Sequence, residues 1–324
     1  MEEAPVTEIS HRTIPTNGIN MHIAEAGEGP LVLLLHGFPE LWYSWRHQLP
    51  ALAAAGYHAV APDVRGYGDS DRPHEIEAYS MKNHIADALG ILDALGAEAA
   101  VIVGHDWGAP MAWNSAVLHP DRYRAVAALS VPFLPRSPMP PTQMFKAIFQ
   151  DNFFYMLYFQ QPGVAEEEFE ADVRRSMLMF MYGASAEGRS DLSVSGAFMN
   201  KPKDAKLFDG LTAPETLPGW LTHDDLDVYT NAFERTGFRG PLNRYRNLDQ
   251  DWEELAELAG STVQQSALYI TGDKDPVGTF APMDPMKASV PKLKIVTIAD
   301  CGHWTQQEEP ERVNAELIEF LRGL

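Results

Sequence analysis

The arrangement of apolar and polar stretches along this chain predicts a mostly parallel β-sheet covered by helices. Continuous apolar runs of roughly four to eight residues are typical of strands buried on both faces, as in a parallel sheet. Runs of this kind occur at residues 31–35, 58–64, 99–103, 126–131, 267–271 and 293–299. Two further extended segments, 8–15 and 20–26, flank Asn17-Gly18, which is a strong signal for a hairpin turn.

Helical periodicity alternates with these strands. Apolar positions recur at helical spacing in residues 80–96, where Ser80 and Gly96 fit the roles of N-cap and C-cap. The chain ends in a second such helix, at residues 313–324. Strands that alternate with helices predict an α/β fold, with a mostly parallel central sheet and helices on both faces.

The alternation stops between residues 132 and 240. This stretch begins with clustered prolines and continues with helical patterns rich in aromatic residues and methionine. We therefore predict an α/β-hydrolase core formed by residues 1–131 and 241–324, with a helical cap (a lid) inserted at 132–240.

Composition excludes several classes of function. The 324 residues include 25 Lys and Arg against 45 Asp and Glu, a formal net charge of −20. Nucleic acids and anionic membranes select basic patches, so neither is an expected partner. No apolar run approaches the roughly 20 residues that span a bilayer, and the N-terminus lacks a signal-peptide pattern, so we expect a cytoplasmic protein without membrane insertion. A single cysteine, Cys301, excludes an intrachain disulfide and a cysteine-based metal cluster.

A short motif bounded by glycines follows the predicted strand 99–103. The motif Gly104-His-Asp-Trp-Gly108 stands between that strand and a helical pattern that begins at Ala109. Small residues on both sides of a central residue allow the sharp turn called a nucleophile elbow, which exposes the central side chain. We therefore predict that Asp106, the central residue, is a nucleophile.

An aspartate at this position predicts a different reaction from that of a serine. A carboxylate is already ionised at neutral pH, since a free aspartate titrates at about 3.9. It can attack a saturated carbon directly and form an alkyl ester. Water must then attack the carbonyl of this ester, and that second step needs a histidine base, an acid that orients it and an oxyanion hole.

Candidates for the base and the acid follow the last two predicted strands. His303 lies in a tight turn after the second of them. Asp275 and Asp273 both follow the first, and we favour Asp275 as the acid, with Asp273 as the competing candidate. The order nucleophile, acid, histidine is that of α/β-hydrolases. We expect Cys301 to pack rather than react, because it lies two residues from its only candidate base.

Two backbone N–H groups are predicted to form the oxyanion hole. One belongs to Trp107, directly after the nucleophile, and the other to Phe38, in the loop after the first apolar strand. The Phe38-Pro39 peptide bond is a candidate for the cis form. Neither His36 nor the Gly66-Tyr-Gly68 loop has the spacing of a metal site or a dinucleotide fingerprint, so we expect no metal and no cofactor.

Five motifs of the chain resemble those of soluble epoxide hydrolases of the α/β-hydrolase fold. They are His36-Gly-Phe-Pro39, Gly104-His-Asp-Trp-Gly108, Asp300-Cys-Gly-His-Trp304 and the cap segments 155–166 and 237–247. The similarity runs from about residue 8 to the C-terminus. It implies an enzyme that converts an epoxide and water to a vicinal diol. Vertebrate members also carry an N-terminal phosphatase domain, and 324 residues leave no room for one, so that activity is not implied.

The resemblance also implies roles for individual residues. The implied catalytic residues are Asp106, Asp275, His303, Tyr155 and Tyr245. Two phenols are suited to an epoxide because they can stabilise and protonate the alkoxide that forms on ring opening. Spacing alone does not decide whether Tyr155 or Tyr158, one helical turn away, is the first tyrosine of this pair. The implied substrate contacts are Phe38, Trp107, Tyr155 and Tyr245.

The cap composition indicates an apolar substrate. Some of its aromatic and methionine residues are expected to line the pocket, and the candidates are Phe133, Phe149, Phe153, Phe154, Phe159 and residues 177–181. The expected partner is therefore a small aryl or alkyl epoxide, bound by a monomer or a homodimer. The alternatives are a haloalkane or haloacid dehalogenase on the same fold, which has no use for the tyrosine pair, and a non-catalytic ligand-binding homologue.

Overall fold

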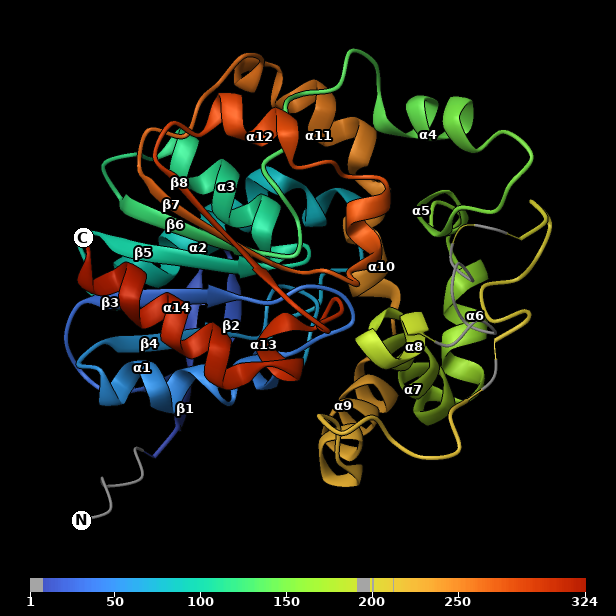
Figure 1. Cartoon of the computed structure of the whole chain (residues 1–324), viewed down its shortest axis with the longest axis horizontal. Coiled ribbons are helices and arrows are strands. Elements are labelled where there is room, and N and C mark those ends of the chain that lie inside the picture. The colour runs from blue at the N-terminus through green and yellow to red at the C-terminus, as the bar shows by residue number, and fades with distance from the viewer. Residues whose placement is uncertain (1–7, 191–198, 200, 212) are drawn as a thin grey trace.

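A computed structural model describes residues 8–190, 199, 201–211 and 213–324 of the chain. An eight-stranded sheet forms its centre, in the order β1-β2-β4-β3-β5-β6-β7-β8 (Figure 1). β1 and β2 are antiparallel, β2 pairs antiparallel with β4, and all remaining pairs are parallel. The strands are β1 (Ser10–Thr16), β2 (Ile19–Ala26), β3 (Leu31–Leu35), β4 (His58–Pro62), β5 (Ala100–His105), β6 (Tyr123–Leu129), β7 (Ser266–Gly272) and β8 (Leu293–Ile298).

All eight extended segments predicted from the sequence are strands, and their ends differ by a few residues. The largest shift is at β6, which runs from Tyr123 to Leu129 although the apolar run predicted 126–131. Arg124 is exposed and interrupts the apolar run near its start, while Ser130 has a φ of 70° and ends the strand. The hairpin at Asn17-Gly18 is also present, with φ of 43° and 78°.

Helices cover both faces of the sheet. Side chains of β3 and β5 alternate between two buried clusters, one on each face, which explains why these strands are apolar throughout. One face carries α2 (Met81–Ala94), α3 (Gly108–Leu118) and α12 (Asp284–Ser289). The other face carries α1 (Gln48–Ala54) and α14 (Pro310–Arg322). Shorter elements are η1 (Trp42–Trp45), η2 (Ile76–Tyr79), η3 (Ala256–Leu258), η4 (Pro276–Thr279) and α13 (Thr305–Glu308).

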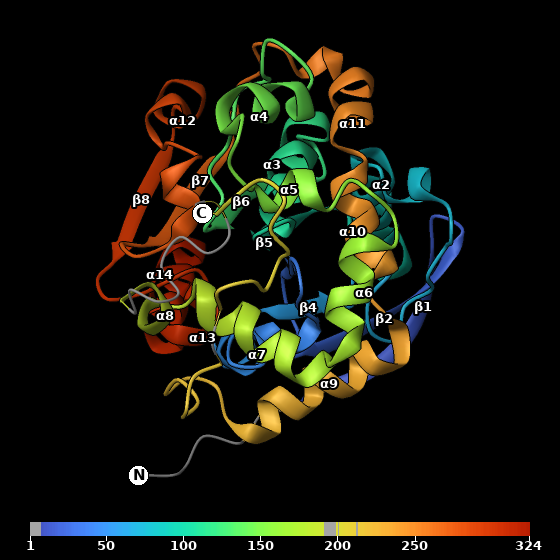
Figure 2. The same cartoon turned by 90° about the vertical axis from the view of Figure 1, so that its right-hand side faces the viewer.

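The described part of the chain between β6 and β7 contains helices and no strand of the sheet. These helices are α4 (Pro141–Phe149), α5 (Tyr155–Tyr158), α6 (Val164–Ala171), α7 (Val173–Ala184), α8 (Ala186–Ser190), α9 (His223–Thr236), α10 (Arg239–Arg246) and α11 (Leu248–Glu254). Figure 2 shows α5, α6, α7 and α9 lying in front of the sheet. This agrees with an inserted cap, although its boundaries at 132 and 240 stay a prediction.

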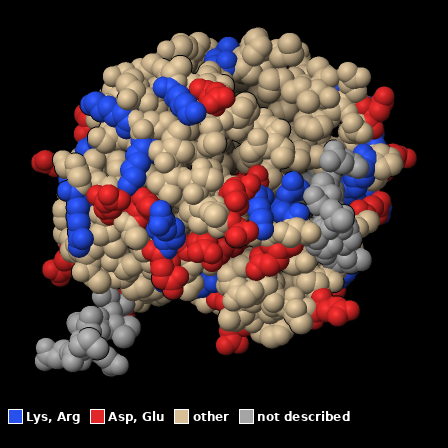
Figure 3. Space-filling view, in the orientation of Figure 1, with Lys and Arg blue, Asp and Glu red and all other residues tan. Residues whose placement is uncertain are grey.

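Charge on the surface is mixed in sign. On the face seen in Figure 3, basic side chains are interspersed with acidic ones and form no continuous basic patch. Among the residues described, no helix combines the length and the apolar character needed to cross a membrane. The net charge of −20 is therefore not gathered into one patch on this face.

Candidate active site

Asp106 sits in a sharp turn between β5 and α3. Its φ of 48° is unusual for a residue other than glycine, and it directs the side chain away from the sheet. A Cβ on Gly104 would lie 2.0 Å from the carbonyl oxygen of Gly108, and a Cβ on Gly108 would lie 2.0 Å from that of Leu35. Only glycine fits at both positions, so the sequence motif has the geometry of a nucleophile elbow.

Each oxygen of the Asp106 carboxylate has a partner. The backbone N–H of Phe38 donates to Oδ1 at 2.8 Å, and His303 Nε2 lies 3.4 Å from Oδ2. The loop that carries Phe38 approaches closely because residue 37 is glycine, where a Cβ would lie 2.3 Å from Oδ1. The Phe38-Pro39 peptide bond is cis, as the sequence suggested. Phe38 thus places an N–H donor where an oxyanion on Asp106 would form.

His303 is held between two carboxylates. Its Nδ1 lies 3.1 Å and 3.3 Å from the two oxygens of Asp275, on the side opposite Asp106. Burial alone would lower the pKa of His303, but the charges of Asp275 and Asp106 outweigh it and raise this pKa well above its usual value. Asp273, the competing candidate, is exposed, and the structure places Asp275 rather than Asp273 against the histidine.

The two tyrosines predicted from the cap lie together. The rings of Tyr155 and Tyr245 are 6.0 Å apart between centroids, and Tyr245 packs edge-on against Trp107 at 5.1 Å. Burial, with the charge of Asp106 as the next cause, raises the pKa of both phenols well above the usual value, so they stay protonated donors. The hydroxyl of Tyr158 instead donates to Glu168.

A cavity of about 330 Å³ reaches Asp106, Trp107 and Tyr155. Its walls are mostly apolar, and the side chains of α4, α11 and the segment after β6 contribute much of them. Of the aromatic and methionine residues predicted to line the pocket, only Phe133 does so within the described part of the chain. The lining residues that sequence reasoning missed include Met144, Phe145, Met156, Trp252 and Phe280.

The other candidates for lining the pocket pack elsewhere. In α7, Met177, Met179 and Met181 are buried and form part of the core of the cap. Phe149 and Phe154 stack on each other at 4.0 Å. Sequence alone gave no means to separate side chains that face the cavity from those that pack between helices.

A buried network beside Asp106 was also not predicted. His105 Nδ1 lies 2.6 Å from Glu40 Oε2, and His105 Nε2 lies 2.8 Å from the backbone oxygen of His303. Both ring nitrogens of His105 are therefore engaged, one by a carboxyl group and one by a backbone carbonyl. Although burial alone would raise the pKa of Glu40, the charge of His105 lowers it to about 2. The buried pair of His105 and Glu40 thus lies against the backbone of His303.

Two residues for which the sequence predicted no catalytic or metal-binding role, His36 and Cys301, are buried. His36 lies with Nδ1 2.9 Å from the oxygen of Gly37, while Nε2 accepts from the N–H of Val64 at 2.9 Å. Cys301 is buried, and burial raises the pKa of its thiol, which disfavours the reactive thiolate.

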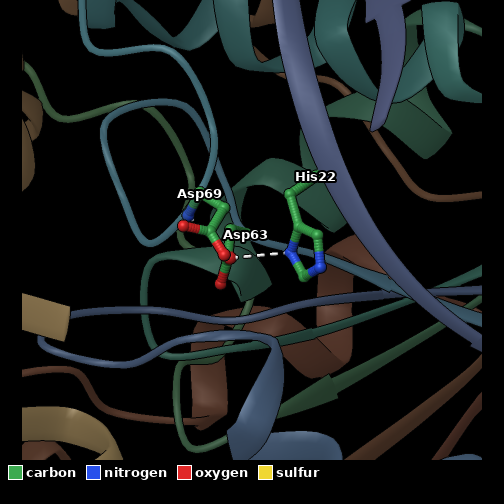
Figure 4. A group of neighbouring side chains, drawn as sticks. All are labelled: His22, Asp63 and Asp69. Carbon is green, nitrogen blue, oxygen red and sulfur yellow. Dashed lines mark hydrogen bonds and ion pairs between the residues drawn. The ribbon is translucent and has the colours of Figure 1, made fainter. Parts of the chain in front are cut away.

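His22, Asp63 and Asp69 form a cluster of groups that could ligate a cation (Figure 4). Their atoms already contact one another: Asp63 Oδ2 lies 2.8 Å from His22 Nδ1 and accepts from the N–H of Asp69 at 3.1 Å. Its Oδ1 accepts from the N–H of Trp42, and Asp69 pairs with Arg235. These hydrogen bonds link β2 to the loop after β4, which is a structural role for the cluster. The expectation of no metal stays a prediction.

Comparison with known proteins identifies the family. A family model described as the alpha/beta hydrolase fold matches residues 30–310. Epoxide hydrolase A of Mycobacterium tuberculosis is 50% identical over 318 residues, which cover 97% of this chain and 98% of that protein. Epoxide hydrolase 3 of Siraitia grosvenorii is 44% identical, with 97% and 98% covered.

A solved structure extends this likeness to the fold. The crystal structure of epoxide hydrolase A from Mycobacterium thermoresistibile superimposes with a TM-score of 0.93 at 49% identity, and the match covers 98% of this chain and 99% of that one. The sheet order, the aspartate elbow and full-length similarity agree. The chain belongs to the epoxide hydrolases of the α/β-hydrolase fold.

Proposed function

We propose that the protein converts apolar epoxides and water to vicinal diols through an alkyl ester on Asp106. The proposal rests on the groups that surround the carboxylate of Asp106. Asp106 lies at the end of an apolar cavity, 3.4 Å from His303, with the Phe38 N–H on one of its oxygens. The cap tyrosine Tyr155 lines the same cavity.

In the first step Asp106 opens the ring. One oxygen of Asp106 attacks an oxirane carbon, the C–O bond of the ring breaks, and its electrons go to the epoxide oxygen. Tyr155 and Tyr245 hydrogen-bond this oxygen and deliver a proton to it, since their raised pKa values keep them protonated until the alkoxide develops.

Alkylation changes the state of His303. In the free enzyme the charges of Asp106 and Asp275 favour the imidazolium form. The ester removes the charge of Asp106, which lowers the pKa of His303 and releases its proton. That proton restores the tyrosine that protonated the alkoxide, so His303 becomes a neutral base at the step that needs one.

In the second step water attacks the ester. His303, oriented by Asp275, takes a proton from water while its oxygen adds to the carbonyl carbon of Asp106. The N–H groups of Phe38 and Trp107 stabilise the resulting oxyanion. The ester C–O bond then breaks, and the leaving alkoxide takes the proton of the carboxyl group newly formed on Asp106. The diol leaves, and the Asp106 carboxylate and the imidazolium of His303 are restored.

The cavity supports the choice of an apolar substrate. Its walls include apolar side chains such as Trp113, Met156 and Val277, which offer few hydrogen bonds to a hydroxylated substrate such as a sugar. Its volume of about 330 Å³ lies at the lower end of the range for small-molecule sites. We also propose that the protein is a monomer or a homodimer and that it is located in the cytoplasm.

Trapping the ester tests the mechanism. The variant His303→Gln keeps the nucleophile but loses the base, so we expect its intact mass to rise by one substrate mass on mixing with styrene oxide. Diol release should fall by about a thousandfold or more, as for loss of a group that assists a covalent nucleophile. The double variant Asp106→Ala/His303→Gln is the control, and it should show no adduct.

Two results would contradict the proposal: absence of an adduct on His303→Gln, or diol formation by Asp106→Ala. A parallel assay with a bromoalkane separates the dehalogenase alternative, because that activity would release bromide. We expect diol from the epoxide and no bromide.

A further inference from the structure

The loop that carries His303 is fixed to the cap as well as to the core. The N–H of His303 donates to the oxygen of Ala184 at 2.9 Å, and the indole N–H of Trp304 donates to the oxygen of Met181 at 2.7 Å. Both acceptors lie in the last turns of α7. On the core side, the hydroxyl of Ser130 donates to the oxygen of His303 at 2.7 Å. The backbone of the proposed base is therefore held from two directions.

Loop and cap meet backbone against backbone. A Cβ on Gly302 would lie 2.4 Å from the nitrogen of Ala186 and 2.7 Å from the oxygen of Ala184. Because these are backbone atoms of the turn between α7 and α8, they cannot rotate away as a side chain could. Any movement of this turn therefore displaces the residue next to His303.

One carboxylate joins the two segments. Oε2 of Glu308 accepts from the N–H of Ala186 and from the N–H of Gly302, both at 2.9 Å. Its Oε1 accepts from the N–H of Trp304, also at 2.9 Å. Glu308 ends α13 and is partly buried. It thus binds both residues that flank His303 and, through the same side chain, the first residue of α8.

We propose that Glu308 is a positioning residue that clamps the His303 loop to the cap for the hydrolysis of the ester. This inference rests on the proposed function, in which His303 acts as the base only in the second step. The imidazole must direct Nε2 at a water beside the ester, and a displacement of about 1 Å is enough to slow such a step about a hundredfold. Ring opening by Asp106 makes no such demand on the loop.

Glu308→Gln tests the clamp with little change of shape. A glutamine has one acceptor oxygen, and its NH₂ group would face at least one of the three N–H donors. Epoxide loss and diol release are followed separately in single turnovers with excess enzyme, by rapid quench and intact-mass measurement. We expect epoxide loss within about twofold of the unmodified protein, diol release slowed by about tenfold or more, and alkyl-enzyme accumulating.

Two companion variants complete the design. Glu309→Gln is the matched control, since it makes the same change at the neighbouring position, and both steps should keep their rates. Glu308→Asp keeps a carboxyl group with a shorter reach, and we expect a slowing of diol release smaller than that of Glu308→Gln. If Glu308→Gln does not fold, the ratio of diol release to epoxide loss in Glu308→Asp tests the clamp instead.

Each outcome has a defined meaning. Equal slowing of both steps, or unchanged diol release in Glu308→Gln, would overturn the clamp while leaving the proposed function intact. If His303→Gln forms no alkyl-enzyme in the same quench, the proposed function fails and the clamp with it. Selective slowing of diol release supports the clamp, because a general loss of structure would slow ring opening as well.

Discussion

Gly37 lies so close to Asp106 that an added methyl group there should disturb one catalytic step. In Gly37→Ala the new Cβ would lie 2.3 Å from Oδ1, 2.4 Å from Cβ and 2.7 Å from Cγ of Asp106. Ordinary van der Waals contact begins at 3.4 Å, so one of the two groups must move by about 1 Å. The φ of Gly37 is not in the left-handed region, so alanine is strained by this contact rather than by its own backbone.

The two possible movements have different kinetic effects. If the Asp106 carboxylate moves, ring opening slows, because the attacking oxygen is displaced from the oxirane carbon. If the loop moves, the Phe38 N–H leaves Oδ1, where it now donates at 2.8 Å, and diol release slows through loss of an oxyanion donor. Either change is expected to cost about a hundredfold in the affected step, from a misplacement of about 1 Å or the loss of one donor.

Single-turnover measurement of epoxide loss and diol release distinguishes the two effects. Gly219→Ala is the matched control, because a Cβ there meets no atom within 4 Å and its φ is not in the left-handed region. We expect both rates to be unchanged in this control. Wild-type rates of both steps in Gly37→Ala, in a protein with unchanged circular dichroism, would refute the reasoning.

The remaining predictions concern the tyrosine pair and the buried pair of His105 and Glu40. Replacement of both Tyr155 and Tyr245 by Phe should slow first-turnover epoxide loss by about a hundredfold or more, while Tyr158→Phe changes it by less than about threefold; full activity of the double variant would show that the pair is misassigned. Since the charge of His105 outweighs burial and lowers the pKa of Glu40 to about 2, Glu40 should stay ionised in the folded protein down to about pH 3. Infrared difference spectra against Glu40→Gln check this, and protonation near pH 4.5 would contradict it.

The strands and the elbow could be predicted because their signals are local. An apolar run such as Leu31–Leu35 has few alternatives to a strand buried on both faces, and all its residues are buried. Glycines at 104 and 108 are required by contacts within a few residues of the turn or with the adjacent strand. The error at β6 has the same origin, because a single exposed residue, Arg124, hides the start of a strand from a search for continuous apolar runs.

The cavity and the buried acids could not be predicted, since they depend on which distant segments meet. Met144 of α4 and Trp252 of α11 line the cavity, although their local patterns do not differ from those of residues in the core of the cap. Glu40 and Glu308 look like surface acids in the sequence, yet their carboxylates accept N–H groups from separate segments. The only local signal was the position of Glu40, directly after the motif His36-Gly-Phe-Pro39.

The order of the two proposed steps follows from the charges around the nucleophile. Asp106 and Asp275 both face His303, and Glu40 faces His105 beneath it. Alkylation removes the charge of Asp106, one of the two carboxylates that raise the pKa of His303 in the free enzyme. Asp275 is unaffected when the ester forms. Its charge therefore stabilises the positive charge that His303 acquires when it takes a proton from water. Asp275→Asn should therefore slow diol release far more than epoxide loss, whereas equal slowing of the two steps would contradict a role of Asp275 that is specific to ester hydrolysis.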